Sequence, residues 1–178
     1  AWCVLKTVEA LGLNVDKAAE KIKTFEPLEG RGKPYTLKLS DHKGTYTLID
    51  DSYSGQPEAM KLAIKSLNSL KANGRKIAVL GKMAELGACS KQKHIEIGQE
   101  LAKSNINIVV GVCPEMTDML AELPPHITQY YFENKDNVAD FLLNQLLQNE
   151  DIVLIKGARY SSKLYQVADE LKEKGLKQ

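Results

Sequence analysis

A repeated alternation of short apolar runs with amphipathic segments constrains the fold of this chain more than any other feature. Four apolar runs predict strands at residues 76–80, 106–112, 128–132 and 152–155. The segments that follow them carry apolar residues at helical spacing, at residues 90–104, 116–123, 137–147 and 164–171. Strands that are apolar on both faces favour a mostly parallel sheet covered by helices on both faces. The helical connections between parallel strands cross over the sheet in a right-handed sense, so the predicted fold is Rossmann-like α/β.

The alternation is introduced by a hairpin and one further helix. Residues 35–39 and 45–49 predict two strands joined by a turn at residues 41–44. Pro57 stands at a typical first helical position. One face of the helix that follows carries Met60, Ala63, Ile64, Leu67 and Leu70.

Two short helices are predicted before the hairpin. The first has apolar residues at helical spacing and Gly12 at its expected end. Asn14 is placed to cap the second, whose apolar positions are Val15, Ala18, Ala19, Ile22 and Phe25. Because no capping residue or initiator methionine precedes the first helix, we expect the sequence to begin inside this element.

A linker is predicted after these two helices, where breaking residues cluster. They are Pro27, Gly30, Gly32 and Pro34. We therefore expect two parts, residues 1–33 and residues 34–178, of which the second has the size of an ordinary globular domain.

Charge and hydropathy exclude several classes of function. The 24 basic and 23 acidic residues leave a net charge of +1, so no electrostatic signature of nucleic-acid binding is present. No apolar run approaches the ~20 residues of a transmembrane helix, and no signal segment opens the sequence. We expect no membrane insertion and a cytoplasmic location.

Cysteine and histidine spacing also argues against two kinds of site. Cys3, Cys89 and Cys113 have no C-x-x-C spacing, which disfavours a disulfide framework or a zinc site. The three histidines, His42, His94 and His126, are scattered, so we expect no metal site built by this chain.

The polar segments after the predicted strands are the candidate sites, since ligands of open α/β sheets bind at the carboxyl ends of strands. The chemically rich segments are residues 50–57, 81–87 and 156–162. Asp51 is suited to a ribose hydroxyl or a metal, or it caps a helix. Lys156 and Arg159 are suited to a carboxylate or phosphate, or they form a solvated helix start. Glu85 and His94 fit a surface or packing role better than a catalytic one.

Two nucleotide-binding motifs are missing from the 178 residues. There is no G-x-x-x-x-G-K-[ST] phosphate loop, and no G-x-G-x-x-G follows a strand. A self-sufficient nucleotide hydrolase and a dinucleotide-dependent oxidoreductase are therefore both disfavoured.

Several of these segments together resemble the C-terminal domain of the Mur ligases. The matching residues are 49–53, 81–87, His94 and 156–159, in this order and spacing. Residues 27–31 are similar to the end of the central ATPase domain of that family. The resemblance covers nearly the whole chain.

The resemblance implies an enzyme that uses ATP and Mg²⁺ to convert a peptide carboxylate into an acyl phosphate. The implied partners are ATP, UDP-MurNAc-tripeptide and D-alanyl-D-alanine, whose amine attacks the acyl phosphate. Mg²⁺ is expected to be held mainly by the central domain, of which residues 1–33 are the tail. We therefore expect the 178-residue chain to be inactive alone, and we expect the intact enzyme to be a monomer.

Residue roles follow from the resemblance by position. Arg31 is expected near the nucleotide and Asp51 near its ribose. Tyr53 and Ser54 are expected near the adenine or the phosphates. Lys156 and Arg159 are expected to face the dipeptide or the reacting phosphate. The chain departs from the usual pattern of the family at Ser54, Gly55, Gln56, Lys82, Ala158 and Tyr160.

Two alternatives remain open. A signalling receiver domain also pairs acidic residues after one strand and places a lysine after a late strand. Against it, Gly81 and Cys113 follow the two central strands, where a phospho-acceptor aspartate is expected. The other alternative is a degenerate, binding-only relative of the ligases, which the departures listed above keep possible.

Overall fold

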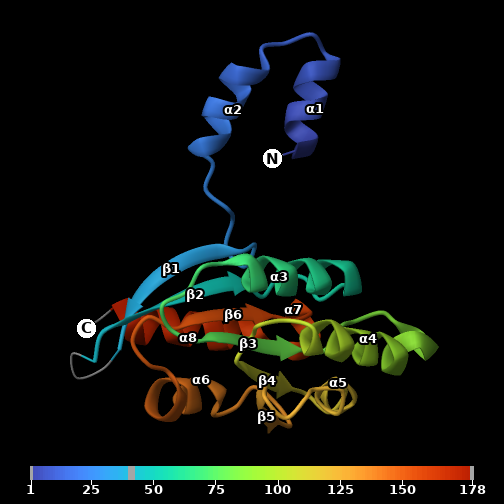
Figure 1. The fold of residues 1–178 in the computed structure, drawn as a ribbon, viewed down its shortest axis with the longest axis vertical. Coiled ribbons are helices and arrows are strands. Elements are labelled where there is room, and N and C mark those ends of the chain that lie inside the picture. Colours follow the sequence, from blue (N-terminus) through green and yellow to red (C-terminus); the bar gives the residue numbers. More distant parts are fainter. Residues whose placement is uncertain (1, 40–42, 177–178) are drawn as a thin grey trace.

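The computed structural model describes residues 2–39 and 43–176, and within them the chain forms one six-stranded sheet of order β1-β2-β6-β3-β4-β5. The strands are β1 (Lys33–Lys38), β2 (Thr45–Asp51), β3 (Lys76–Gly81), β4 (Ile108–Val112), β5 (Thr128–Phe132) and β6 (Ile152–Lys156). β1 pairs antiparallel with β2, and the other four pairings are parallel. The predicted Rossmann-like α/β fold is confirmed (Figure 1).

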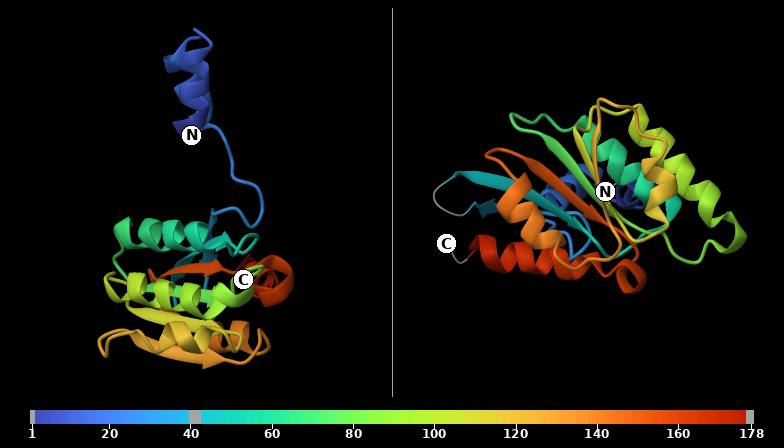
Figure 2. Two further views of the ribbon diagram at one scale, coloured as in Figure 1. Left: turned by 90° about the vertical axis from the view of Figure 1, so that its right-hand side faces the viewer. Right: turned by 90° about the horizontal axis from the view of Figure 1, so that it is seen from below.

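Helices cover both faces of the sheet, as the crossovers require. Those of the main body are α3 (Pro57–Ser69), α4 (Ser90–Ala102), α5 (Met116–Leu120), α6 (Val138–Phe141), α7 (Arg159–Ser162) and α8 (Leu164–Leu176). The turns η2 (Gly87–Cys89) and η3 (Leu142–Leu146) precede α4 and follow α6. In Figure 2, α3 and α4 lie on one side of the strands and α8 on the other.

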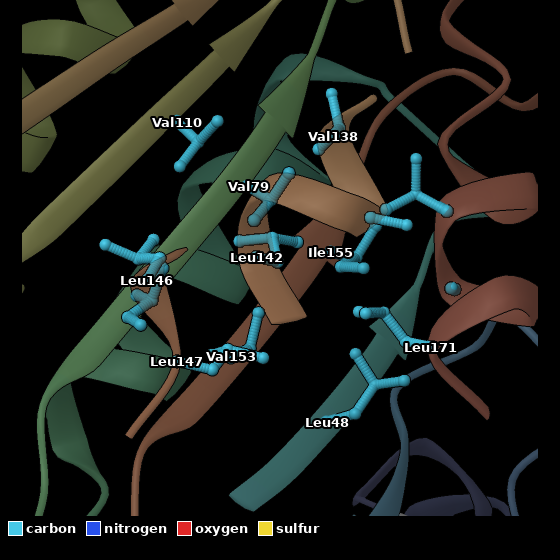
Figure 3. Packing of buried hydrophobic residues seen from close by; sticks show 14 of the residues in the cluster. Leu48, Val79, Val110, Val138, Leu142, Leu146, Leu147, Val153, Ile155 and Leu171 are labelled. Carbon is cyan, nitrogen blue, oxygen red and sulfur yellow. The ribbon is translucent and has the colours of Figure 1, made fainter. Parts of the chain in front are cut away.

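Alternate residues of the central strands supply two separate cores. In β3, Val79 belongs to the core under α6, η3 and α8, whereas Ala78 and Leu80 belong to the core under α3, α4 and α5. Figure 3 shows Leu142 of η3 and Leu171 of α8 within the first core. Each fully buried leucine or isoleucine contributes roughly 1.5–3 kcal/mol, so the two cores fix the strand ends on which the site is built.

The predicted hairpin is formed by β1 and β2, with Tyr35 opposite Leu48. Its ends are closed by a hydrogen bond from Leu39 N to Gly44 O of 2.9 Å. Residues 41 and 42 of the predicted turn lie outside the described residues, so His42 does too.

The predicted helices differ from the observed ones in several details. The segment 137–147 forms the short α6 and then a π-helical turn, which keeps Leu142 and Leu146 buried. The last predicted helix lies within α8, and the short α7 before it was not predicted; Lys163, in a left-handed conformation, separates the two. Leu70, predicted on the buried face of α3, follows its end and is 40% exposed.

The two N-terminal helices are α1 (Trp2–Ala10) and α2 (Val15–Lys23), and neither contains a buried residue. The predicted cap is confirmed: Asn14 Oδ1 accepts a hydrogen bond of 2.8 Å from Lys17 N. Figure 1 shows the pair standing apart from the sheet, beyond an extended segment. None of the helices in the described part of the chain has the length and apolar character needed to cross a membrane.

Candidate functional site

The sheet order brings the three polar segments predicted from sequence to one edge. β6 lies between β2 and β3, and Lys156 at its end pairs in register with Asp51 and with Leu80. The segments after β2, β3 and β6 are therefore neighbours at the carboxyl ends of parallel strands, where α/β sheets bind ligands.

Lys156 is an internal cation of this edge. Its Nζ donates to Asp51 Oδ2 at 2.7 Å and to the carbonyl oxygen of Ser54 at 3.0 Å. The residue is 1% exposed, so the solvated-surface alternative for Lys156 is wrong. The ion pair ties the end of β6 to the segment after β2.

Asp51 pairs with Lys156 and does not cap the helix that follows it. α3 has Gln56 at its N-cap, without a side-chain capping bond. Asp51 is therefore not a helix cap, and one of its oxygens is taken by Lys156.

Two arginines contact one tyrosine ring at the mouth of this edge. The guanidinium of Arg31, from the segment before β1, lies 3.8 Å from the ring centroid of Tyr53. Arg159, at the start of α7, lies 5.7 Å from the same ring and 4.3 Å from the ring of Tyr165. A guanidinium over an aromatic face gains roughly 0.5–1 kcal/mol where it is exposed. The two rings therefore orient both cations.

A cleft of ≈310 Å³ lies beside these residues. It is lined by Arg31, Tyr53, Ser54, Gly55, Gln56, Ala84, Glu85, Ala158, Arg159, Tyr160 and Ser161. Six residues were predicted to bind the nucleotide or to face the reacting groups, and four of them, Arg31, Tyr53, Ser54 and Arg159, share this cleft. Its two guanidiniums outweigh the single carboxylate of Glu85, which favours a phosphate or carboxylate ligand.

A larger groove of ≈730 Å³ runs between α3 and the strands β2 and β6. Its walls are mostly apolar, with Leu62, Leu67 and Leu154 among the lining residues. Asp51 and Lys156 lie in this groove, and Arg31 and Ser54 line both hollows. The cleft carries both arginines, so we take it as the candidate anion site.

Close backbone approach holds the three segments together. A Cβ atom on Gly55 would lie 2.4 Å from Ala158 N, and one on Gly157 would lie 2.5 Å from Ser162 Oγ. Ala158 N donates to the carbonyl oxygen of Lys82 at 3.1 Å. Glycine at 55 and 157 is therefore a steric requirement of this edge rather than a source of mobility.

His94 has a packing role, as predicted. It is fully buried, and its Nε2 accepts a 3.1 Å hydrogen bond from Met83 N. Its Nδ1 lies 2.8 Å from the carbonyl oxygen of Ser90, which assigns the proton to Nδ1. The imidazole thus fixes the segment that carries Glu85, an exposed residue with φ of 61°.

The side chain of Lys82 has a partner of its own in Glu115. It forms a 2.8 Å ion pair with Glu115, and that hydrogen bond raises the pKa of Lys82. Burial works to raise the pKa of Glu115, but the bond from Lys82 helps to bring it below its usual value. Burial raises the pKa of the nearby Cys113 thiol, so Cys113 is not an activated nucleophile.

Metal binding finds no support on this edge. Among the residues that the structure describes, no group of three or more His, Cys, Asp or Glu side chains is placed to hold an ion.

Sequence reasoning missed the partners that hold the predicted residues. Tyr165 supports Arg159 from α8, and Lys172 of the same helix binds Glu29 and Asp50. Glu29 and Lys172 are 143 positions apart, so no local pattern could have joined them.

Comparison with known proteins relates the chain to a group of ligases. The family described as "Mur ligase, glutamate ligase domain" matches residues 37–159. A UDP-N-acetylmuramoyl-tripeptide–D-alanyl-D-alanine ligase of Rickettsia prowazekii is 26% identical over 93% of this chain and 35% of the relative. A ligase of the same name from Buchnera aphidicola is 36% identical over 70% of this chain and 26% of the relative.

Solved structures give the same relationship. MurF ligase from Thermotoga maritima in complex with ADP has a TM-score of 0.74 and 25% identity, over 97% of this chain and 37% of that chain. This chain thus spans between 26% and 37% of the length of these three relatives.

Proposed function

Because this chain belongs to the Mur ligase family, we propose that it is the C-terminal part of an ATP-dependent ligase that adds D-alanyl-D-alanine to UDP-MurNAc-tripeptide. The resemblance predicted from the sequence is confirmed by the family match. The substrates are proposed from the names of the relatives, which are UDP-N-acetylmuramoyl-tripeptide–D-alanyl-D-alanine ligases.

We also propose the domain division expected from the sequence. Residues 34–178 are the C-terminal domain, and residues 1–33, with α1 and α2, are the tail of a central ATP-binding domain. Two observations support this division: neither α1 nor α2 contains a buried residue, and Trp2 is 70% exposed. Amphipathic helices whose apolar side chains are not buried by their own chain are stabilised by packing against another surface.

The observation that carries the proposal is the pair of guanidiniums over Tyr53. Arg31 and Arg159 come from opposite ends of the chain and meet at one cleft. Two preoriented cations favour a group that carries several negative charges, such as the phosphates of ATP or the charge that develops during phosphoryl transfer. In this proposal Arg31 contacts the nucleotide, and Arg159 contacts the reacting phosphate or the dipeptide carboxylate.

The other residues predicted from the sequence have proposed roles beside the two arginines. Because Oδ2 of Asp51 accepts from Lys156, we propose that Oδ1 accepts a hydrogen bond from a ribose hydroxyl. Ser54 lies in the cleft and is proposed to meet the nucleotide together with the exposed ring of Tyr53. Lys156 is proposed to act by holding Asp51 and the Ser54 carbonyl in place, because its ammonium is buried.

Activation of the tripeptide carboxylate as an acyl phosphate, followed by attack of the dipeptide amine, is the proposed reaction. Mg²⁺ would neutralise phosphate charge in that reaction, and we propose that the central domain holds it. The cleft of this chain would close over the bound nucleotide and exclude water. We further propose that the intact protein is cytoplasmic and monomeric.

The test is formation of the pentapeptide product by the intact protein that carries this chain. Mass spectrometry should detect UDP-MurNAc-pentapeptide only when ATP, Mg²⁺, UDP-MurNAc-tripeptide and D-alanyl-D-alanine are all present. The 178-residue chain alone is the matched control and should release no ADP, because it has no phosphate loop. Nucleotide binding by the intact protein without any product would support the degenerate, binding-only alternative instead.

A further inference from the structure

Lys172, on α8, joins three carboxylates behind the cleft. Its Nζ lies 3.0 Å from Glu29 Oε2, 3.0 Å from Asp50 Oδ2 and 2.8 Å from Asp169 Oδ1. The Lys172 side chain is 13% exposed, and that of Asp50 is 3% exposed. Burial works to lower the pKa of Lys172, but hydrogen bonds with Asp169, Glu29 and Asp50 raise it above its usual value. The ammonium therefore stays charged.

Glu29 is the point at which this cluster holds the segment before β1. Its second oxygen, Oε1, accepts a 2.7 Å hydrogen bond from the hydroxyl of Tyr35. The ring of Tyr35 lies 5.2 Å from Lys172 Nζ. Both oxygens of Glu29 are thus fixed to the main body of the fold, from β1 and from α8.

Backbone bonds extend this hold along the residues that follow Glu29. Gly32 N donates to Asp50 O at 2.7 Å, and Tyr53 N donates to Gly30 O at 3.0 Å. Gly30 and Gly32 have φ of 69° and 80°, a left-handed conformation that glycine adopts without strain. Arg31 stands between these two glycines, and its guanidinium is directed onto the ring of Tyr53.

We propose that Glu29 and Lys172 are positioning residues that hold the turn at residues 29–32, and thereby Arg31, at the mouth of the anion cleft. Without them the turn would keep its two backbone bonds but lose its side-chain attachment to β1 and α8. Arg31 would then lose more conformational entropy when a ligand binds, and the affinity for that ligand would fall. This inference rests on the proposed function, in which Arg31 contacts the nucleotide.

Glu29 is the better of the two residues to change. Its side chain is 69% exposed, so Glu29→Ala leaves no buried charge behind. Lys172→Met would leave the carboxylate of Asp50 buried without its cation, and loss of folding would obscure the result. Lys172→Arg keeps the charge and serves as the conservative variant.

The experiment is a titration of ADP into the intact protein that carries this chain. Glu29→Ala should raise the Kd for ADP by about threefold to tenfold, and by less than about twofold when Arg31 is already alanine. Glu26→Ala, in the same segment and 82% exposed, is the matched control and should leave the Kd unchanged. Lys172→Arg should stay close to the parent.

Two results would overturn this inference but leave the proposed function standing, because the parent protein would still bind ADP. One is an unchanged Kd in Glu29→Ala. The other is an equal loss of affinity with and without Arg31, which would mean that Glu29 acts through overall stability. Failure of the parent protein to bind ADP would instead overturn the proposed function, and this inference with it.

Discussion

The ammonium of Lys156 lies 2.7 Å from the carboxylate of Asp51, and the two side chains are 2% and 24% exposed. The pair is therefore asymmetric: water reaches the acid but hardly the base. Because β2 and β6 are parallel neighbours, the pair also locks two strand ends that are 105 positions apart.

This asymmetry predicts unequal costs for removing the two partners. Asp51→Ala leaves a buried ammonium bonded only to the Ser54 carbonyl, and we expect it to lower the free energy of unfolding by about 3–5 kcal/mol. Lys156→Met leaves a carboxylate that water can solvate, and we expect a loss of about 1–2 kcal/mol. Urea unfolding of the 178-residue chain measures both. Equal losses, or a larger loss for Lys156→Met, would contradict the burial described here.

Ser54 gives a prediction about the nucleotide. Asparagine is longer and offers an amide with two donors and an acceptor, so Ser54→Asn should change ATP affinity by about 0.5–1.5 kcal/mol, or a few-fold to about tenfold. Titration of the intact protein with Ser54→Asn and Ser54→Ala side by side is the measurement. Ser66→Asn is the matched control, because Ser66 lines the groove beside α3 but not the cleft. If both Ser54 variants bind ATP like the parent, residue 54 does not meet the nucleotide.

Gly55 gives a prediction about packing between segments. A methyl group at this position would lie 2.4 Å from Ala158 N and 2.9 Å from Ala158 Cα, and backbone atoms do not yield easily. Gly55→Ala should therefore destabilise the chain by about 1–3 kcal/mol. Thermal unfolding checks this, with Gln56→Ala as a neighbouring exposed control expected to stay within about 0.5 kcal/mol. A Gly55→Ala variant as stable as the parent would show that the two segments are not in contact.

Glu29 gives a prediction about pH. The hydrogen bond from Tyr35, followed by that from Lys172, holds the pKa of Glu29 below its usual 4.5. A lowered pKa in the folded state means that the stability from Glu29 is present above the usual value and is lost as pH falls through the folded value. The difference in unfolding temperature between the parent and Glu29→Gln should therefore be constant near neutral pH and shrink below about pH 4.5. A difference that persists at low pH would contradict the ion pair.

The strands and helices were predictable because their signals are local. Pro57 and Asn14 mark helix starts by their own chemistry, and β5 was predicted with its observed bounds. The sheet edge on which the site lies followed from a general rule of parallel sheets. That rule selected residues 50–57 and 156–162 as candidate sites, and Asp51, Ser54, Lys156 and Arg159 of these segments line the groove or the cleft.

What the sequence could not supply is the orientation of side chains across the fold. Lys156 is an internal cation rather than an open one, because the carboxylate of Asp51 reaches it from the next strand. Lys172 belongs to an amphipathic helix whose charged face gave no sign of partners on β2 and in the segment before β1. The π-helical turn after α6 depends on burying Leu142 and Leu146 together, which is a tertiary effect.

Hydrogen–deuterium exchange of the intact protein, with and without ADP, tests the central claim most directly because it locates the nucleotide without any substitution. The account predicts slower exchange in residues 28–32, 52–56 and 157–161. It predicts no change in β5, the outermost strand on the side of the sheet away from β2. Protection confined to residues 62–71, along the groove beside α3, or absent from all of these segments while ADP is bound, would contradict the assignment of the cleft to the nucleotide.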